Sequence, residues 1–328
     1  MKQLTILVPN GYHNLSSVVG SYEVFTKANE YYQSIGKEPV FKIQLAGTSR
    51  SVKLYGDLFS IKTQLSIAEV RRTNLIIIPA LRTDFLRSIK QVEELKIWLI
   101  KMAAQGSEIA SICTGAFLLA STGLLKDKNC STHWFAADIF SKMFPDVNLT
   151  IDKIITDEDG VYTNGGAFSF LNLLIYLVEK YYDRKTAVYC SKLFQIEIDR
   201  QSQSPFVIFS TQKKHDDEVI KKAQAHIEKN MTSKISTSLL SEKFSVSRRS
   251  FDRRFIRATG NTPLEYLQRV KIEAAKKQFE STGKTVNEVM YNVGYSDIKA
   301  FRQIFRRITG LLPLDYRNRF NKERLMVN

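Results

Sequence analysis

One pattern of residues occurs twice near the C-terminal end of the chain, with fifty positions between the copies. The two copies read Phe251-x3-Phe255-x3-Thr259-Gly260-x2-Pro263 and Phe301-x3-Phe305-x3-Thr309-Gly310-x2-Pro313. In each copy, phenylalanines four residues apart form the apolar stripe of a short helix, a glycine ends that helix, and a proline begins the next segment. The repeat therefore predicts two similar helical units in tandem.

The positive charge of the chain is concentrated around this repeat. Of the formal net charge of +15, residues 218–328 carry +12, from 23 Lys and Arg against 11 Asp and Glu. Basic side chains held on one face release condensed counterions from nucleic acid when they bind it. The charge excess favours a nucleic-acid partner, although a merely solvated basic surface would have the same composition.

Each copy has the parts of a helix-turn-helix, in which a support helix and a tight turn precede a recognition helix that enters the DNA major groove. The predicted support helices are 238–243 and 286–292, and the predicted recognition helices are 248–258 and 297–308. Placing the phenylalanines inward puts basic and amide side chains on the outer face, because successive helical residues are about 100° apart. The predicted DNA-contacting residues are Arg248, Arg249, Arg253, Arg257, Lys299, Arg302, Gln303 and Arg307.

These side chains predict two kinds of contact with double-stranded DNA. Arginine pairs well with guanine and glutamine with adenine, so Arg249, Arg253 and Gln303 are the expected base contacts. Arg257 and Arg307 are the expected phosphate contacts. Between the recognition helices, a run of helix formers from Pro263 would span roughly 27 Å, and one DNA turn is about 34 Å. One chain could therefore place both recognition helices in successive major grooves.

The first part of the chain has a different pattern, in which apolar strands alternate with amphipathic helices. Continuous apolar runs such as 75–78 are typical of strands buried on both faces. We predict an α/β fold for residues 1–199, with a mostly parallel sheet covered by helices, followed by an all-α domain at 218–328. Residues 200–217 lose periodicity and gather Ser, Gln, Pro and charge, which predicts a linker.

Composition limits the cellular setting. The three cysteines, Cys113, Cys130 and Cys190, are an odd number and argue against a secreted disulfide framework. No apolar stretch reaches the roughly 18 residues of a membrane span. We expect a soluble cytoplasmic protein that needs no metal or other cofactor and does not bind a membrane.

Residues 218–322 resemble the DNA-binding domain of the AraC family. The resemblance is carried by Val286-Asn-Glu-Val-Met-Tyr-Asn-Val-Gly294-Tyr295-Ser296-Asp297, followed by Phe301-x3-Phe305-Arg306-Arg307-x-Thr309-Gly310-x2-Pro313. It implies a sequence-specific transcriptional regulator that binds promoter or operator DNA. Members of this family are often activators that contact RNA polymerase, and the remaining domain senses a signal.

A possible reactive site lies in the first domain. Residues 108–117 read as a strand, a sharp turn and a helix, with Cys113 at the turn. Such an elbow exposes a side chain at a helix N-terminus, where the helix dipole can favour a thiolate. Catalysis would also need a base and an orienting group, for which His133 and Glu23 are the candidates.

Residues 3–190 resemble the class I glutamine-amidotransferase-like, intracellular-protease-type superfamily, which implies a flavodoxin-like sandwich. Within it the chain is most similar to the GlxA-type regulators, which join this domain to an AraC-type one. The resemblance maps the elbow cysteine to Cys113, the acid beside it to Glu23, the strand-end histidine to His133 and a pocket-lining turn to 163–167. The predicted ligand-pocket residues are Glu23, Cys113, Thr114, His133 and Gly166.

Two departures from catalytic relatives argue against turnover. Pro79-Ala80-Leu81-Arg82 stands where they carry Pro-Gly-Gly, so the chain lacks glycines that help form an oxyanion site. Thr114 follows the cysteine where protease-like relatives have a histidine. We therefore predict a non-enzymatic domain that binds a small-molecule effector at the carboxyl ends of the strands and forms a homodimer.

Other interpretations stay open at this level. The first domain could serve dimerisation alone, could be an amidase- or hydratase-like enzyme, or could be a redox switch at Cys113. Cys113 could equally be an inert buried thiol, and His133 a core histidine. Regulators of this type are associated with small nitrogen compounds such as amino acids and quaternary ammonium molecules, but the sequence selects no effector, operator or sign of regulation.

Overall fold

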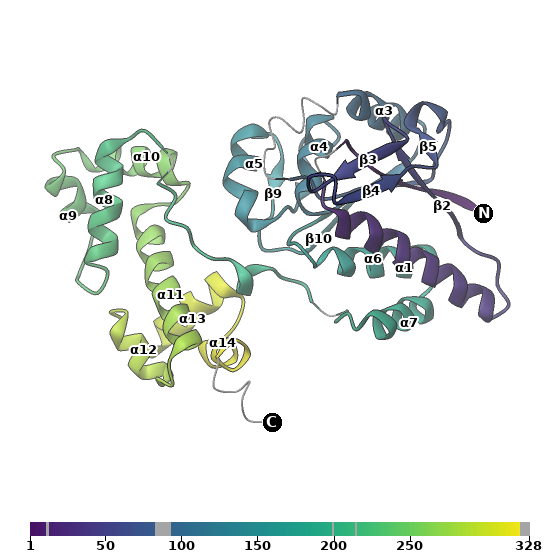
Figure 1. Ribbon diagram of the computed structural model, residues 1–328. Coiled ribbons are helices and arrows are strands. Elements are labelled where there is room, and N and C mark those ends of the chain that lie inside the picture. The colour runs from purple at the N-terminus through teal and green to yellow at the C-terminus, as the bar shows by residue number, and fades with distance from the viewer. Residues whose placement is uncertain (11–12, 83–92, 199, 214, 322–328) are drawn as a thin grey trace. The chain divides into compact units, whose positions relative to one another are not determined.

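The chain folds into two compact units. The structure, a computed structural model, describes residues 1–10, 13–82, 93–198, 200–213 and 215–321. The division lies between Gln203 and Ser204, inside the predicted linker. We call the two parts the N-terminal unit and the helical unit, and each is described by itself (Figure 1).

The N-terminal unit is built on a seven-stranded sheet with the order β10-β11-β7-β6-β1-β2-β5. Neighbouring strands run parallel, except that β10 is antiparallel to β11. The strands are β1 (Lys2–Leu7), β2 (Phe41–Gly47), β5 (Leu65–Ser66), β6 (Leu75–Ile78), β7 (Glu108–Ser111), β10 (Ile155–Glu158) and β11 (Val161–Asn164). The predicted mostly parallel α/β sandwich is confirmed.

Helices cover both faces of this sheet (Figure 1). One layer consists of α1 (Leu15–Ser34), α6 (Phe170–Tyr181) and α7 (Arg184–Phe194), and the other of α3 (Glu93–Ala104), α4 (Ala116–Ser121) and α5 (Ala137–Met143). Since successive strand residues point to opposite faces, Leu75 and Ile77 pack in the core under α1, while Ile76 and Ile78 pack under α3. All four residues of β6 are therefore apolar because each faces one of the two cores.

Two small sheets lie outside the main one. A hairpin joins β3 (Ser51–Leu54) to β4 (Phe59–Lys62), and β8 (Asn129–Cys130) pairs with β9 (Asn148–Leu149). The hairpin turn includes three consecutive residues with positive φ, Tyr55, Gly56 and Asp57. Neither the hairpin nor α7 was predicted from the sequence.

The helical unit contains both predicted helix-turn-helix motifs. Its helices are α8 (Glu218–Lys229), α9 (Thr237–Lys243), α10 (Arg248–Thr259), α11 (Pro263–Ser281), α12 (Val286–Asn292), α13 (Ile298–Thr309) and α14 (Pro313–Phe320). The predicted support helices (α9 and α12) and recognition helices (α10 and α13) are confirmed to within one residue at each end. Gly260 and Gly310, with φ of 69° and 75°, end the two recognition helices as predicted.

The spacer helix α11 belongs to two hydrophobic cores. Near its start, Tyr266 packs with the phenylalanines of α10, and near its end, Phe279 packs with those of α13. The first core also includes α8, and the second includes α12 and α14. The two motifs are therefore joined through a shared buried helix.

A close contact connects the two motifs a second time. Gly294, in the turn between α12 and α13, has a φ of 76°, and a Cβ added there would lie 2.7 Å from Cα of Thr232 in the loop after α8. Only glycine allows this approach. Lys271 of α11, which is buried, donates a hydrogen bond from Nζ to the Gly294 carbonyl at 2.9 Å.

Candidate nucleic-acid interface and ligand cavity

The first recognition helix has an apolar inner face and a basic outer face. Phe251 and Phe255 are fully buried, whereas Arg249, Arg253 and Arg257 are exposed, as their helical spacing predicts. Arg248, in the first turn of α10, is exposed as well. The face that could enter a DNA groove therefore presents a row of guanidinium groups.

The second recognition helix has the same arrangement. Phe301 and Phe305 are fully buried, and Lys299, Arg302 and Gln303 are exposed. Asp297 caps the helix by accepting a hydrogen bond from the Lys299 amide at 2.9 Å. The base-reading side chains predicted on both helices thus lie on outer faces.

Arg307 differs from the other predicted DNA contacts. It is exposed, but its Nη2 donates a hydrogen bond to Oε1 of Gln268 on α11. Its guanidinium is therefore directed toward the spacer helix. A phosphate contact by Arg307 would have to form beside that bond or replace it.

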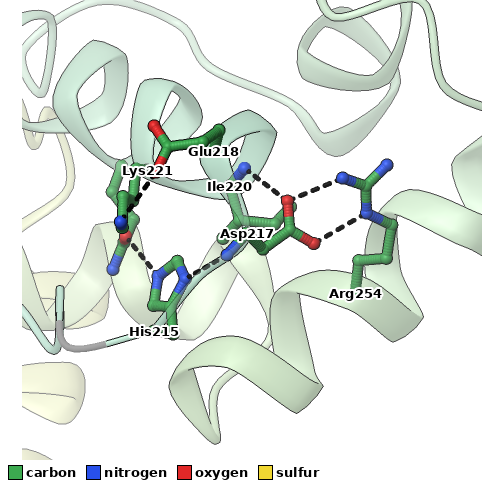
Figure 2. Close-up of polar contacts among 7 residues, drawn as sticks. His215, Asp217, Glu218, Ile220, Lys221 and Arg254 are labelled. Carbon is green, nitrogen blue, oxygen red and sulfur yellow. Dashed lines mark hydrogen bonds and ion pairs between the residues drawn. The ribbon is translucent and has the colours of Figure 1, made fainter.

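Arg254 of α10 forms an ion pair with the carboxylate of Asp217 (Figure 2). Its Nε donates to Oδ2 of Asp217 at 2.8 Å, and its Nη2 donates to Oδ1 at 2.6 Å. The same Oδ1 accepts the amide hydrogen of Ile220, so Asp217 also caps α8. The hydrogen bonds from Arg254 lower the pKa of the Asp217 carboxyl. Arg254 adds to the basic composition of α10 but is neutralised by this pair.

The N-terminal unit contains a cavity of about 300 Å³ at the carboxyl ends of β6 and β7. It is lined by Asn14, Ser16, Ser17, Tyr55, Ala80, Leu81, Arg82, Cys113, Thr114, His133, Phe135, Ala136, Ala167 and Phe170. Three of the five predicted pocket residues, Cys113, Thr114 and His133, are among them. The carboxyl edge of a parallel sheet is where ligands usually bind in such folds.

Cys113 lies at the predicted elbow, where its φ of 54° marks a left-handed turn between β7 and the following helical turn. A Cβ added at Gly115 would lie 2.6 Å from the Pro79 carbonyl oxygen, so the elbow packs directly against the end of β6. The Cys113 side chain is 5% exposed, and burial raises the pKa of its thiol to about 11. At neutral pH it is a thiol and not a thiolate.

The position of Glu23 corrects its assignment to the pocket. Glu23 is exposed on α1 and does not line the cavity. The α1 side chains that face inward include Ser17 and Ser21, and Ser17 is the one at the cavity. Ser17 Oγ accepts the Ala80 amide at 3.2 Å, so this amide is not free to form an oxyanion site.

His133 is half-buried at the cavity wall and caps a short helical turn. Its Nδ1 accepts the amide hydrogen of Phe135 at 3.1 Å, and burial lowers its pKa. The ring is therefore neutral at neutral pH, with its proton on Nε2. His133 can act as a hydrogen-bond donor to a ligand.

Thr114 and Gly166 hold the cavity wall by local contacts. Thr114 Oγ1 donates to the Leu81 carbonyl at 2.6 Å. Gly166 is buried with a φ of 87°, and an added Cβ would lie 2.4 Å from Ser169 Oγ. The predicted turn therefore packs against α6, and its neighbour Ala167 is the residue that reaches the cavity.

Other polar cavity residues were not predicted from the sequence. Asn14 caps α1, which a search for capping residues before an apolar run could have found. Tyr55 comes from the unpredicted hairpin, and the Arg82 guanidinium lies 5.6 Å from the centre of its ring. Among the described lining residues none is acidic, so the cavity is suited to an uncharged or anionic group beside Arg82.

Within the described ranges, no group of three or more His, Cys, Asp or Glu side chains is placed so that it could hold a metal ion.

None of the helices in the described part of the chain combines the length and apolar character that crossing a bilayer requires.

Two protein-family models match the chain. The model for the DJ-1/PfpI family matches residues 3–179, which is more than half of the sequence. A helix-turn-helix domain model matches residues 240–319. The two matches fall on the N-terminal unit and on the tandem motifs, respectively.

Similar proteins include named regulators. The HTH-type transcriptional regulator GbdR of Pseudomonas aeruginosa is 24% identical over 226 residues, which cover 67% of this chain and 60% of GbdR. Less than two thirds of the length of GbdR is thus matched. The HTH-type transcriptional regulator GlxA of Rhizobium meliloti is 24% identical over 226 residues, covering 67% of this chain and 68% of GlxA.

Among solved structures, one from Vibrio parahaemolyticus that is described as a transcriptional regulator protein is similar to this chain. It is 25% identical with a TM-score of 0.52, and the match covers 58% of this chain and 98% of that one. The likeness agrees with a fold shared by regulators.

Proposed function

We propose, because the chain belongs to the DJ-1/PfpI family and carries an AraC-type helix-turn-helix domain, that this protein is a DNA-binding transcriptional regulator whose N-terminal unit binds a small-molecule effector. The observation that carries the proposal is the pair of recognition helices with buried phenylalanines and exposed basic faces. Two such helices on one buried spacer suit two major-groove contacts on one duplex.

The cavity supports the effector part of the proposal. Its volume of about 300 Å³ suits a small metabolite, and its wall combines apolar side chains with the donors of Arg82 and His133. Amino acids, quaternary ammonium compounds that also carry a carboxylate, and other small metabolites with an uncharged or anionic group to place beside Arg82 are the first candidates for the effector. Cys113, Thr114 and His133 are its proposed contacts, together with Arg82.

The geometry favours binding over catalysis in this cavity. The Cys113 thiol has a pKa of about 11, the Ala80 amide is occupied by Ser17, and Glu23 lies elsewhere. An activated nucleophile needs a lowered pKa or an adjacent base. We therefore propose neither hydrolysis nor a thiol redox switch.

The remaining parts of the proposal concern partners. We propose promoter or operator DNA as the macromolecular ligand, activation through RNA polymerase, and a homodimer formed by the N-terminal unit. A regulator of this kind works in the cytoplasm. DNA binding by the full chain is the part to test first, since the others depend on it.

The test is selection of DNA from a random duplex library by the purified full chain. We expect an enriched sequence with two half-sites whose centres are about 10 base pairs apart. Alanine at Arg249, Arg253 and Gln303 together should abolish the enrichment. Absence of any enriched sequence, with no duplex binding at low salt, would refute the proposal.

A thermal-shift screen of the same protein tests the effector. Both tryptophans, Trp98 and Trp134, lie in the N-terminal unit, so their fluorescence follows that unit alone. A ligand that binds the folded state raises its melting temperature. A hit recovered chemically unchanged supports a sensor, and a consumed hit would instead indicate an enzyme.

A further inference from the structure

The first residues of the helical unit form a short 3-10 helix, Ser204–Phe206, and then a segment without regular secondary structure that lies on α11. We call residues 204–212 the strap. Lys276 of α11, only 4% exposed, donates from Nζ to the Val207 carbonyl at 2.5 Å and to Oε2 of Glu273 at 2.8 Å. The same Glu273 oxygen accepts the Phe209 amide at 3.2 Å. A buried ion pair of the spacer helix therefore binds the strap backbone on both sides of Ile208.

The strap touches the elements of both helix-turn-helix motifs. Phe206 packs edge-on against Phe320 of α14, with ring centres 5.6 Å apart. Phe209 packs edge-on against Tyr266 at the start of α11, with ring centres 5.3 Å apart. Farther along, Gln212 accepts a hydrogen bond from Asn261, directly after the first recognition helix. A shift of the strap would therefore disturb side-chain contacts in both hydrophobic cores.

Gln203, the residue directly before the strap, is hydrogen-bonded to the loop that carries the cavity residue His133. Gln203 is 1% exposed in the N-terminal unit. Its Nε2 donates to the Thr132 carbonyl at 2.9 Å, and its Oε1 accepts the Trp134 amide at 3.3 Å. One side-chain amide thus binds the backbone on both sides of His133, the residue that lines the cavity.

The same loop is bound to the elbow. Thr132 Oγ1 donates to the Cys113 carbonyl at 3.0 Å. Hydrogen bonds therefore join the Cys113 carbonyl, Thr132, the Trp134 amide and the Gln203 side chain, on either side of His133. Leaving a buried polar group without a hydrogen-bond partner costs free energy. A displacement of the His133 loop would therefore break the hydrogen bonds of the Gln203 amide with this loop and destabilise the position of its side chain.

We propose that Gln203 is the positioning residue that couples the cavity to the DNA-binding unit. The inference rests on the proposed function, because it assigns the regulation of the same cavity. With its side-chain amide bound to the His133 loop, Gln203, the residue before the strap, is held in the N-terminal unit. When a ligand moves that loop, the amide loses its partners in the loop, and the strap loosens from Lys276 and Glu273.

This coupling requires two states that a ligand distinguishes. A ligand shifts an equilibrium only by its difference in affinity for the two states. Here the states differ in whether the Gln203 amide is bound to Thr132 and Trp134. The readout is the order of the strap, which packs against residues of both hydrophobic cores.

The experiment perturbs the loop and measures the strap in the full chain, without any ligand. His133→Ala removes the acceptor of the Phe135 amide and loosens the loop. Hydrogen exchange is followed in peptides that cover 204–212, where Phe209 donates to Glu273. The same substitution is made in Gln203→Leu and in the matched control Gln201→Leu, whose side chain is exposed.

We expect His133→Ala to speed exchange of the strap several-fold in the otherwise unchanged chain and equally in Gln201→Leu. In Gln203→Leu the strap should already exchange fast, and His133→Ala should add nothing. Unchanged strap exchange in His133→Ala, or an equal increase in Gln203→Leu, would overturn the proposal. If tryptophan fluorescence shows that Gln203→Leu is unfolded, Gln203→Glu replaces it, because it keeps the acceptor and loses both donors.

A separate arm distinguishes this proposal from the proposed function. Every variant is titrated with a fluorescein-labelled duplex of random sequence. If the unchanged protein fails to bind the duplex, DNA binding is refuted, while the exchange pattern still decides whether Gln203 couples loop and strap. If it binds and the exchange effects are additive, only the coupling role is refuted.

Discussion

Arg254 and Ile304 occupy the same position in the two copies of the repeat, but the two residues are held in different ways. Arg254 forms a two-pronged ion pair with Asp217, whereas Ile304 packs against the second hydrophobic core. The partner Asp217 is the N-cap residue of α8, whose buried residues pack in the first core. The first motif is therefore supported by an ionic contact that the second replaces with an apolar one.

Removing this ionic contact should destabilise the first motif. We expect Asp217→Ala to lower the free energy of unfolding of the helical unit by about 1–2 kcal/mol, because it removes a helix cap and a partly exposed charge pair. Thermal unfolding followed by far-ultraviolet circular dichroism measures the effect. Glu218→Ala, which breaks the exposed pair with Lys221, is the control and should leave the melting temperature unchanged.

Arg253→Ala should weaken binding mainly at the selected operator. A lost bidentate contact with guanine costs about 1–3 kcal/mol, or roughly five- to 150-fold in affinity. Fluorescence anisotropy with the operator and with random duplex separates the two. An equal loss on both duplexes would refute a base-reading role for Arg253.

Arg257→Ala should weaken binding on every duplex alike. If Arg257 contacts a phosphate, the slope of log affinity against log salt concentration becomes shallower by about 0.9. The slope is measured by repeating the anisotropy titrations at several salt concentrations. Loss of operator preference without a change in slope would contradict the phosphate assignment.

Cys113 should react slowly in the native protein. Since burial raises the pKa of its thiol to about 11, alkylation by iodoacetamide at neutral pH should be far slower than in the unfolded chain and should accelerate as the pH rises toward 11. Mass spectrometry identifies the labelled cysteine. Cys113→Ser should leave DNA binding intact, and peroxide-dependent DNA binding in the unchanged chain would restore the redox-switch hypothesis.

The N-terminal unit should lose stability in mild acid because of His13. This ring is fully buried, its Nδ1 lies 2.6 Å from the Pro9 carbonyl oxygen, and its Nε2 has no hydrogen-bond partner within the described part of the chain. Burial lowers its pKa from the usual 6.5 to about 4. The unfolded chain therefore takes up the proton first, and stability falls as the pH drops from about 6.5 to about 4, by up to about 3 kcal/mol.

Urea unfolding followed by tryptophan fluorescence across this pH range measures the loss. His13→Asn keeps a donor for the Pro9 carbonyl and should flatten the profile, whereas His226→Asn, in the helical unit, should not. A profile that His13→Asn leaves as steep as before would assign the acid sensitivity to other groups.

The helices of the helical unit were predicted closely because the residues that specify each helix lie within it or directly beside it in the sequence. Phenylalanine spacing, the glycines after Thr259 and Thr309, and the capping residue Asp297 all lie within one helix length of what they specify. The helix α7 was missed because its buried positions are Thr186, Ala187, Cys190 and Ser191, which are small or polar and give no apolar stripe.

The candidate sites were predicted only in part. Cys113 and His133 line the cavity, and the short elbow and strand-end patterns were enough to propose both. Glu23 was misplaced, because the apolar pattern of α1 does not show which of its polar residues, Ser17 or Glu23, faces inward. Tyr55 and Arg82 meet at the cavity from separate segments, and the pairing of Arg254 with Asp217 also joins distant positions. Such long-range contacts follow from packing and not from local sequence.

The burial of α11 in two cores fixes the distance and the angle between the two recognition helices. The recognition helices cannot slide or rotate independently without exposing Tyr266 or Phe279. Each base pair inserted between half-sites moves one of them by about 3.4 Å and turns it by about 34° around the duplex axis. For an operator bound by both helices, we therefore expect the angular phase of the half-sites to matter as well as their bases, and any other spacing to require the duplex to overtwist or untwist.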